Sequence, residues 1–250
     1  MKLDAEQQRA LREDGYLMLP GLIPRPLVDA ALQSINHSLG SAGMPPDQLP
    51  GYRARTFTPE LVKSPAILDL MTGSPLMAAA EAALGPGNAR TSSEAQIALR
   101  FPGPPGAAGS PPVPHIDGIS APGNGVPAGT LYTFTALGAV FLSDVLEPDQ
   151  GNFTVWPGSH RVIEAFFREH GPAGMIDRFP DLPLGQPRQV LARAGDAVLA
   201  HYQLAHGIAP NRGPHIRYAT FYRLFHIRHE SLGTRPLTDQ WLEWEGLDAG

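Results

Sequence analysis

The sequence predicts a mainly β protein, a sandwich or jelly roll, preceded by a helical N-terminal region. Glycine and proline, with 27 of each in 250 residues, favour short strands and many turns over a helical bundle. From about residue 94 onward, apolar residues alternate or gather in the short runs that are typical of strands. Loops separate these strands and helices do not alternate with them, which argues against a parallel α/β fold.

Composition predicts one domain over residues 1–250, because 42% of the residues are hydrophobic and only 17% are charged. A net charge of -5, without any run of Lys or Arg, argues against nucleic acid or an acidic membrane as partner. The chain has no cysteine, so any metal site would depend on His, Asp and Glu. The polar first residues and the lack of a long apolar run predict a cytoplasmic protein. The sequence does not indicate an oligomeric state.

Residues 1–93 are predicted to be mainly helical and to pack on the β body. Asp4, with Gln7 in the capping-box position, begins a helix that ends near Gly15. A short strand follows, and then a second helix that Gly40 closes. Residues 41–52 are expected to form a loop, and residues 59–85 two short helices that are broken at proline and glycine.

Residues 94–230 are predicted to form the β core. The expected strands are residues 94–101, 130–144, 153–156 and 215–227, with two more between 186 and 211 that are joined by the turn Ala194–Asp196. Two segments interrupt the core and are predicted lids. One is the loop 102–129, in which 15 of 28 residues are Gly or Pro, and the other is the helical or irregular segment 161–187. The tail with Trp241 and Trp244 is expected to be a short helix.

A histidine and a carboxylate lie two positions apart in the first of these loops, in the stretch PPVPHIDGIS. Alternate residues share one side of an extended chain, so His115 and Asp117 can point to one place. Two histidines and one carboxylate form the facial triad of non-haem Fe(II) oxygenases. The spacing alone is weak evidence, since such a pair is more often a turn beside a surface histidine. Farther along the chain, His206 stands at a strand end and Arg217 on the next strand, where a guanidinium could bind a carboxylate through two hydrogen bonds.

Three motifs together resemble the phytanoyl-CoA dioxygenase family of Fe(II)- and 2-oxoglutarate-dependent oxygenases. They are His115-x-Asp117, the segment GNFTVWPGSHR at 151–161, and His206 followed eleven residues later by Arg217. The opening EQQRALREDGYLMLPGLIP is also similar, so the resemblance extends from about residue 5 to about residue 230. It implies a double-stranded β-helix, the jelly-roll, cupin-like fold.

The resemblance also implies roles for these residues. His115, Asp117 and His206 would bind Fe(II) and form the catalytic centre, and Arg217 would hold the distal carboxylate of 2-oxoglutarate. O2 would be consumed, a small organic molecule hydroxylated or otherwise oxidised, and succinate and CO2 released. Related halogenases carry a small residue where Asp117 stands, which favours oxidation over halogenation.

Four further residues are weaker candidates. Gln96 and Arg100 share one face of a strand, where Gln96 could contact the cosubstrate or substrate and Arg100 the substrate, or both could be an outward polar face. Arg223 has the same parity as Arg217, and a second inward arginine needs an anion, either from the substrate or from a structural acid. Trp156 could contact the substrate but is more often a core residue.

The remaining histidines are expected to be structural. His160 would hold a turn and His201 would pack in the core, while His226 and His229 would lie at a solvated strand edge. Two other functions stay open at this point. One is a jelly-roll protein that binds a small molecule without oxidising it, and the other is a metal-dependent isomerase or hydrolase on the same fold.

Overall fold

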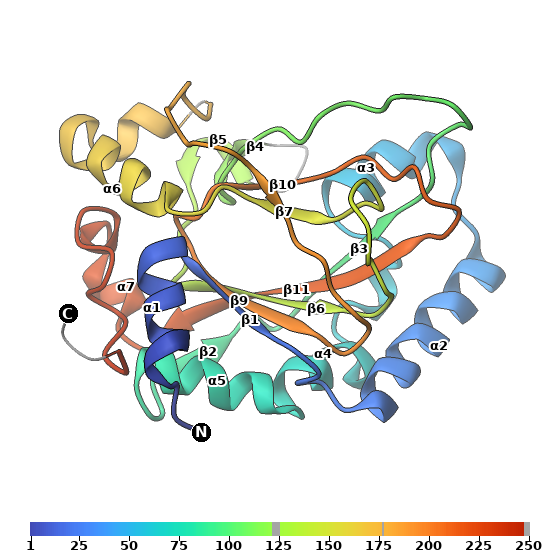
Figure 1. Cartoon of the computed structure of the whole chain (residues 1–250), viewed down its shortest axis with the longest axis horizontal. Coiled ribbons are helices and arrows are strands. Elements are labelled where there is room, and N and C mark those ends of the chain that lie inside the picture. The colour runs from blue at the N-terminus through green and yellow to red at the C-terminus, as the bar shows by residue number, and fades with distance from the viewer. Residues whose placement is uncertain (122–125, 177, 248–250) are drawn as a thin grey trace.

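The computed structural model describes residues 1–121, 126–176 and 178–247, and its centre is an antiparallel sheet (Figure 1). The strand order is β1-β9-β6-β11-β2, and β3 also pairs with β11. The bounds are β1 Tyr16–Leu19, β2 Ala89–Thr91, β3 Gln96–Arg100, β6 Ala136–Phe141, β9 Ala197–His201 and β11 Arg217–His226. β11 is the longest of these strands and pairs with β6, β3 and β2, so it carries most of the sheet.

A smaller sheet faces the main one. It has the order β10-β7-β8, and a separate pair is formed by β4 and β5. The bounds are β7 Phe153–Val155, β8 Arg188–Gln189, β10 His206–Ile208, β4 Ile119–Ala121 and β5 Val126–Leu131. This mainly antiparallel architecture with helices confirms the predicted jelly-roll class, although the described strands do not close into a barrel.

The N-terminal helices form largely as their sequence signals predict. α1 spans Ala5–Asp14, with the Asp4–Gln7 capping box formed and Gly15 ending the helix in a left-handed conformation. α2 spans Arg25–Ala42, so it continues two residues beyond Gly40, and Gly43 is its C-cap. α4 (Pro65–Thr72) and α5 (Pro75–Leu84) are the two predicted short helices.

One prediction in this region is wrong. Residues 41–52 were expected to be a loop, but they contain the 3-10 turn Pro46–Gln48 and the start of α3, Leu49–Ala54. Proline is compatible with the first turn of each element, because a backbone N–H at that position would have no hydrogen-bond acceptor within the helix. The prolines in this segment therefore begin helical elements and do not form a loop.

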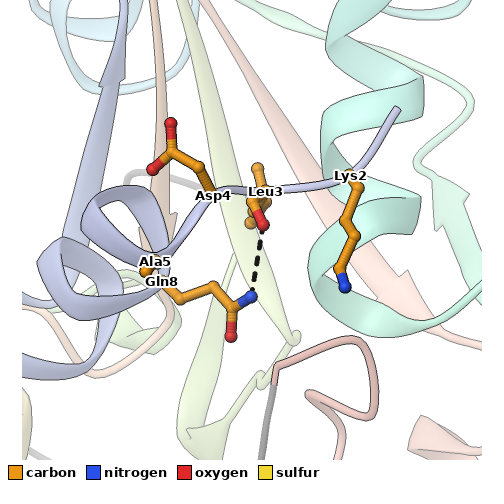
Figure 2. Close-up of a pocket in the computed structure, with 5 residues that line it drawn as sticks. All are labelled: Lys2, Leu3, Asp4, Ala5 and Gln8. Carbon is orange, nitrogen blue, oxygen red and sulfur yellow. Dashed lines mark hydrogen bonds between the residues drawn. The ribbon is translucent and has the colours of Figure 1, made fainter.

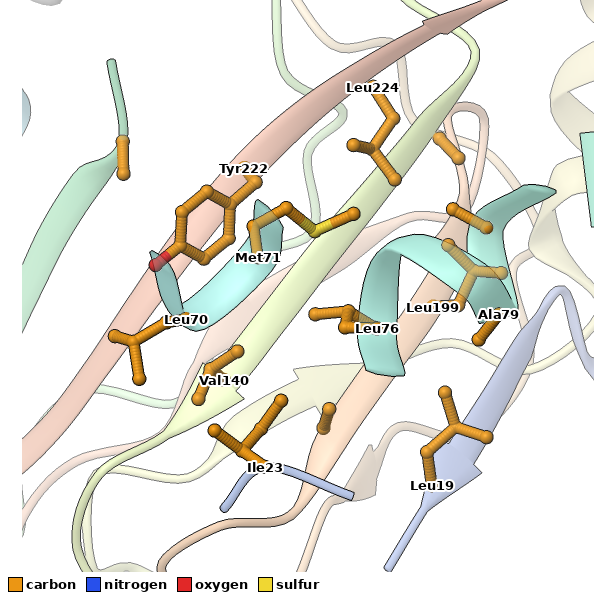
Figure 3. Close-up of a cluster of buried hydrophobic side chains, with 14 of the residues drawn as sticks. Leu19, Ile23, Leu70, Met71, Leu76, Ala79, Val140, Leu199, Tyr222 and Leu224 are labelled. Atoms are coloured by element: carbon orange, nitrogen blue, oxygen red, sulfur yellow. The ribbon is translucent and has the colours of Figure 1, made fainter. Parts of the chain in front are cut away.

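A hydrophobic core fills the space between the main sheet and the helices (Figure 3). Alternate residues of β11 point to it, so Tyr222 and Leu224 contact the helical layer, and the Tyr222 hydroxyl donates to the carbonyl of Ile67 at 2.6 Å. Labelled partners in Figure 3 are Leu19, Ile23, Leu70, Met71, Leu76, Ala79, Val140 and Leu199. Each large side chain buried in this way stabilises the fold by about 1.5–3 kcal/mol.

The other face of β11 points between the two sheets. Arg217, Ala219, Phe221 and Arg223 lie on it, because side chains alternate along a strand. Phe221 belongs to a second core with Phe153 of β7 and Phe141 of β6. This side of the strand is here called the interior face of β11. Polar side chains on it, such as Arg217 and Arg223, point into the space between the two sheets.

Two more expectations need correction. The segment 130–144 was predicted as one long strand, but β5 ends at Leu131 and β6 begins at Ala136. The chain changes partners there, since the amide of Tyr132 bonds Gly118 while the amide of Thr135 bonds Leu224 in the main sheet. The tail around Trp241 and Trp244 forms turns, not a helix, and Trp244 stacks on His201.

Residues 122–125 of the first predicted lid and residue 177 of the second lie outside the described residues. The rest of the second segment contains α6, Ser159–His170, and a 3-10 turn at Pro172–Met175.

Across the described ranges no single helix has the length and apolarity to cross a membrane, while the bent pair α4 and α5 meets that test only when both are taken together.

Candidate metal centre

Three of the predicted site residues converge between the two sheets. One side-chain atom from each of His115, Asp117 and His206 lies within 4.8 Å of the others. Asp117 Oδ1 is 3.9 Å from His115 Nε2 and 3.6 Å from His206 Nε2. Ligands about 2.1 Å from a metal and at right angles to one another stand about 3 Å apart, so small side-chain movements would close the set around one ion.

The backbone fixes which histidine nitrogens face this point. His115 Nδ1 lies 3.3 Å from the carbonyl of Val113, and His206 Nδ1 lies 3.0 Å from the carbonyl of Leu204. Each Nδ1–H can donate to its carbonyl, which turns both Nε2 atoms toward Asp117, where they could bind a metal.

A backbone bridge holds the two histidines together. His115 and His206 form an antiparallel pair in which each amide donates to the other's carbonyl, at 3.0 and 2.9 Å. Their rings are 4.6 Å apart. β10 begins at His206 and pairs with β7, so the small sheet positions one ligand directly and the other through this bridge.

Charge and burial set the protonation of the three groups. Desolvation of the ring and, to a smaller extent, the neighbouring His206 lower the pKa of His115 to about 4, although 47% of its side chain is exposed to solvent. Burial lowers the pKa of His206, but its hydrogen bond and attraction to Asp117 outweigh that and raise it. Burial raises the pKa of Asp117, yet His206, Arg223 and His115 together hold it well below its usual range. The site thus presents an ionised carboxylate and a neutral His115, two of the forms that bind metal.

Arg217 is buried, at 3% exposure, on the interior face of β11. Its Nε donates to the carbonyl of Gly151 at 2.8 Å and its Nη1 to the carbonyl of Ala98 at 2.9 Å. Burial and then the nearby Arg100 lower its pKa to about 10. No carboxylate pairs with Arg217 in the described ranges, so this buried cation has no anionic partner there.

The weaker candidates take different positions. Gln96 and Arg100 lie on the face of β3 opposite the buried Ile97 and Leu99, and the register places Arg100 beside Arg217. Gln96 donates to the carbonyl of Arg55 at 2.7 Å. Arg223 faces the interior, as parity predicts, and its Nη2 lies 3.7 Å from Asp117 Oδ2.

Trp156 is buried at 6% exposure in the core between the sheets, close to Gly207. Its place there is the core position that its residue type favours.

Four more histidines make contacts within the fold, with one difference from expectation. His160 Nε2–H donates to the carbonyl of Arg12 at 3.1 Å, and His201 Nε2–H donates to the carbonyl of Gln240 at 2.9 Å. His226 and His229 were expected at a solvated edge, but His226 is buried and His229 lies 2.8 Å from the buried Glu243. The turns of the C-terminal tail cover this edge, which local sequence could not show.

Sequence reasoning missed two tyrosines beside Asp117. The backbone of Tyr132 binds Gly118, the neighbour of Asp117, and its ring lies under the Arg223 guanidinium. The Tyr202 hydroxyl is buried with no hydrogen-bond partner. Neither residue belongs to a recognisable motif, so no local signal identifies them.

A surface pocket at the N-terminus is unrelated to this centre (Figure 2). It is lined by Lys2, Leu3, Asp4, Ala5 and Gln8, and Gln8 Nε2 donates to the carbonyl of Leu3 at 3.2 Å. None of the predicted site residues lines it.

Comparison with known proteins decides the family. The model of the phytanoyl-CoA dioxygenase family matches residues 11–219, which include all three converging side chains and Arg217. The chain belongs to the phytanoyl-CoA dioxygenase family. Membership in this family and the donor set of the three side chains identify a non-haem iron and 2-oxoglutarate-dependent enzyme. A comparison with curated protein sequences gave no significant match.

Solved structures share the fold of this phytanoyl-CoA dioxygenase family member. HygX from Streptomyces hygroscopicus, with nickel and 2-oxoglutarate bound, is 21% identical over 90% of this chain and 88% of its own, with a TM-score of 0.60. EctD from S. alaskensis is 18% identical over 91% of this chain and 78% of its own, with a TM-score of 0.59. The carbocyclase SnoK from nogalamycin biosynthesis is 19% identical over 90% and 84%, with a TM-score of 0.54. At these identities the likeness establishes the fold.

Proposed function

We propose that this protein is an Fe(II)- and 2-oxoglutarate-dependent dioxygenase that hydroxylates or otherwise oxidises a small organic molecule. The observation that carries the proposal is the convergence of His115, Asp117 and His206, with both Nε2 atoms facing Asp117, together with a buried Arg217 that has no carboxylate partner in the described chain. HygX, which has a similar fold, was solved with a divalent metal and 2-oxoglutarate together.

The donor set fits a transition metal better than a hard cation. Two imidazoles and one carboxylate suit Fe(II), whereas Mg²⁺ and Ca²⁺ prefer oxygen ligands, and the family match supports iron among the transition metals. Three protein ligands leave further positions of an octahedron for small molecules. When bound, iron activates O2 with two electrons from 2-oxoglutarate, so that substrate C–H becomes C–OH while 2-oxoglutarate becomes succinate and CO2.

The residues of the chain would orient and neutralise the reactants. Arg217 would bind the distal carboxylate of 2-oxoglutarate, because its guanidinium is held rigidly by the carbonyls of Gly151 and Ala98. Gln96 and Arg100 face the same side and are candidates for further contacts. Phe153 packs 5.5 Å from the His206 ring and also 5.5 Å from Phe221, so the metal would have an apolar, water-excluding wall on that side. Segments 102–129 and 161–187 would be the lids.

The first experiment is an anaerobic titration of metal-free protein with Fe(II) and then 2-oxoglutarate. A weak visible charge-transfer band is expected when the cosubstrate chelates the iron. His206→Ala should abolish the band, and Arg217→Ala should require far more 2-oxoglutarate, while the surface variant Arg25→Gln should match the wild type. Bound Fe(II) without a band would overturn the proposal. Succinate release upon exposure to O2 would then separate an oxygenase from a binding protein, an isomerase or a hydrolase.

A further inference from the structure

A second arginine on the interior face of β11 has polar groups that are not satisfied by the protein. Arg223 makes no side-chain hydrogen bond to any described residue, and its one ionic contact, with Asp117 Oδ2, is 3.7 Å long. Its guanidinium lies over two aromatic rings, 5.4 Å from the centre of Tyr132 and 5.7 Å from that of Phe134. The rings hold the cation in place through its face and leave its N–H groups free to donate in the guanidinium plane.

A buried hydroxyl next to this arginine is also without a partner. The Tyr202 ring lies edge-on to Phe134, with their centres 4.7 Å apart, so Tyr202 and Arg223 both contact the same ring. Its hydroxyl is buried and makes no hydrogen bond. Burial, and then the charge of Asp117, raise the pKa of Tyr202, so the phenol stays protonated and remains a donor. Native proteins rarely leave a buried donor unpaired unless something else binds it.

The position of these groups separates them from the cosubstrate arm. Arg217 and Arg223 are six residues apart on one strand, or about 20 Å along it. Arg100 lies opposite Arg217, so it belongs to that end of the face. Asp117 is in contact with Arg223 and with both histidines, so Arg223 lies beside the metal centre. A molecule held at Arg223 would therefore lie next to the iron and apart from the Arg217 end of the strand.

Charge indicates what this molecule is. Asp117 is the one ionic partner of Arg223 among the described residues, and it would become a ligand of Fe(II). Arg223 would then be able to pair with one further negative charge. A carboxylate carries one such charge in a planar form that suits a guanidinium, whereas a phosphate monoester carries nearly two.

We propose that Arg223, Tyr202 and Tyr132 anchor the substrate, and that this substrate is a small organic acid. Its carboxylate accepts hydrogen bonds from Arg223 and from the Tyr202 hydroxyl, and its apolar part lies along the Tyr132 ring, which is 44% exposed. The inference rests on the proposed oxygenase function and adds a substrate class to it.

The test compares acids with neutral molecules of the same shape. Aliphatic and aromatic monocarboxylic acids are each paired with their primary amide. Binding is measured by saturation-transfer NMR with metal-free protein and by the change in the visible band of the Fe(II)–2-oxoglutarate complex. We expect acids to bind about tenfold or more tightly than amides, because a charge-assisted hydrogen bond is lost in the amide.

Variants test which residues cause the preference for acids over amides. Arg223→Gln should remove this preference while leaving the affinity for 2-oxoglutarate within a small factor of wild type. Tyr202→Phe should reduce the preference. Arg25→Gln, an exposed arginine on α2, should keep it. Tyr202→Phe removes an oxygen that makes no bond in the fold, so this variant tests the anchor even if Arg223→Gln folds poorly.

Three results would overturn the anchor: equal binding of acids and amides, an acid preference that survives in Arg223→Gln, or no acid binding at about 10 mM, a concentration that would reveal even a weak site. Loss of the proposed function would look different. In that case the visible band would be missing from wild-type protein, while the NMR comparison with metal-free protein would still report on the acids.

Discussion

A β-carbon on Gly118 would overlap the carbonyl of Tyr132, so the residue after Asp117 has no room for a side chain. The amide of Tyr132 donates to the carbonyl of Gly118 at 2.8 Å, and Gly118 has a φ of 83°. This close approach fixes the direction of Asp117 and brings the Tyr132 ring beside it.

Gly118→Ala should therefore weaken metal binding and destabilise the fold. The clash and the left-handed backbone together should lower the free energy of unfolding by about 2–4 kcal/mol. Gly43→Ala is the matched control, since Gly43 has a φ of 72° but no atom within 4 Å of the place where a β-carbon would stand. It should cost about 1 kcal/mol and keep the metal site. Denaturant unfolding and Mn(II) titration measure both, and equal behaviour of the two variants would refute the close-approach argument.

A divalent metal should stabilise the folded protein. Mn(II), which resists oxidation better than Fe(II), is expected to raise the midpoint of thermal unfolding, because a ligand at a hundredfold excess over its Kd adds about 2.7 kcal/mol. EDTA should reverse the shift. Asp117→Ala should abolish it, and Asp239→Ala, a change in the C-terminal tail, should preserve it. An unchanged shift in Asp117→Ala would place the metal elsewhere.

Arg217→Lys should separate charge from geometry. Lysine keeps the positive charge but cannot make both backbone bonds to Gly151 and Ala98, so unfolding should become easier by about 1–3 kcal/mol. The Kd for 2-oxoglutarate should rise at least about tenfold, because the two-pronged contact is lost. Calorimetric titration of the Mn(II)-loaded variant measures it, and wild-type affinity would mean that the cosubstrate does not use Arg217.

Removing the Tyr202 hydroxyl should not harm stability. Tyr202→Phe is expected to leave the free energy of unfolding unchanged or to raise it by about 1 kcal/mol, since a buried hydroxyl without a partner is costly. Tyr222→Phe is the contrast, because that hydroxyl donates to the carbonyl of Ile67, and its loss should cost about 1 kcal/mol. A clear loss of stability in Tyr202→Phe would show that the protein itself satisfies the hydroxyl.

Acid should destabilise the protein through two buried histidines. Burial lowers the pKa of His201 to about 3 and that of His160 to about 4, and His201 Nδ1 also accepts the amide of Gln203. Their folded pKa values lie below the unfolded one of about 6.5, so their contribution is complete above pH 6.5 and is lost as the pH falls toward 4. The loss should approach about 1.4 kcal/mol per pH unit for each group.

The measurement is the free energy of unfolding from pH 7 to pH 4. His201→Gln should be less stable than wild type at pH 7 but should have a shallower pH slope. His37→Gln, a change on the exposed side of α2, should leave the slope as it is. A slope that His201→Gln does not change would assign the acid sensitivity to other groups.

Local patterns predicted most of this fold. The capping box of α1, the proline-led starts of α4 and α5, and the alternation in β3 and β11 each arise from interactions within a few residues. Alternation also placed Arg223 on the face of Arg217. The break between β5 and β6 was missed because the sequence has no turn signal between Leu131 and Ala136, and only the change of partners at Tyr132 and Thr135 ends one strand and starts the next.

The site residues also divide into those that the sequence predicted and those that only the folded structure shows. The three converging residues and Arg217 were found through motifs whose order matches a family, not through their distances. The anion expected for Arg223 is, within the described residues, Asp117 itself, and this contact joins residues 106 positions apart in the chain. Tyr132 and Tyr202 could not be found because their relevance comes only from where the folded chain puts them.

The bridge between His115 and His206 has a consequence for when iron can be acquired. These residues are 91 positions apart, and the strands that position them must already be paired before their nitrogens meet. A nascent or partly unfolded chain therefore offers only isolated side chains, which hold a transition metal weakly. Tight loading would be confined to molecules that have completed folding, so metal content in a preparation would count the correctly assembled fraction.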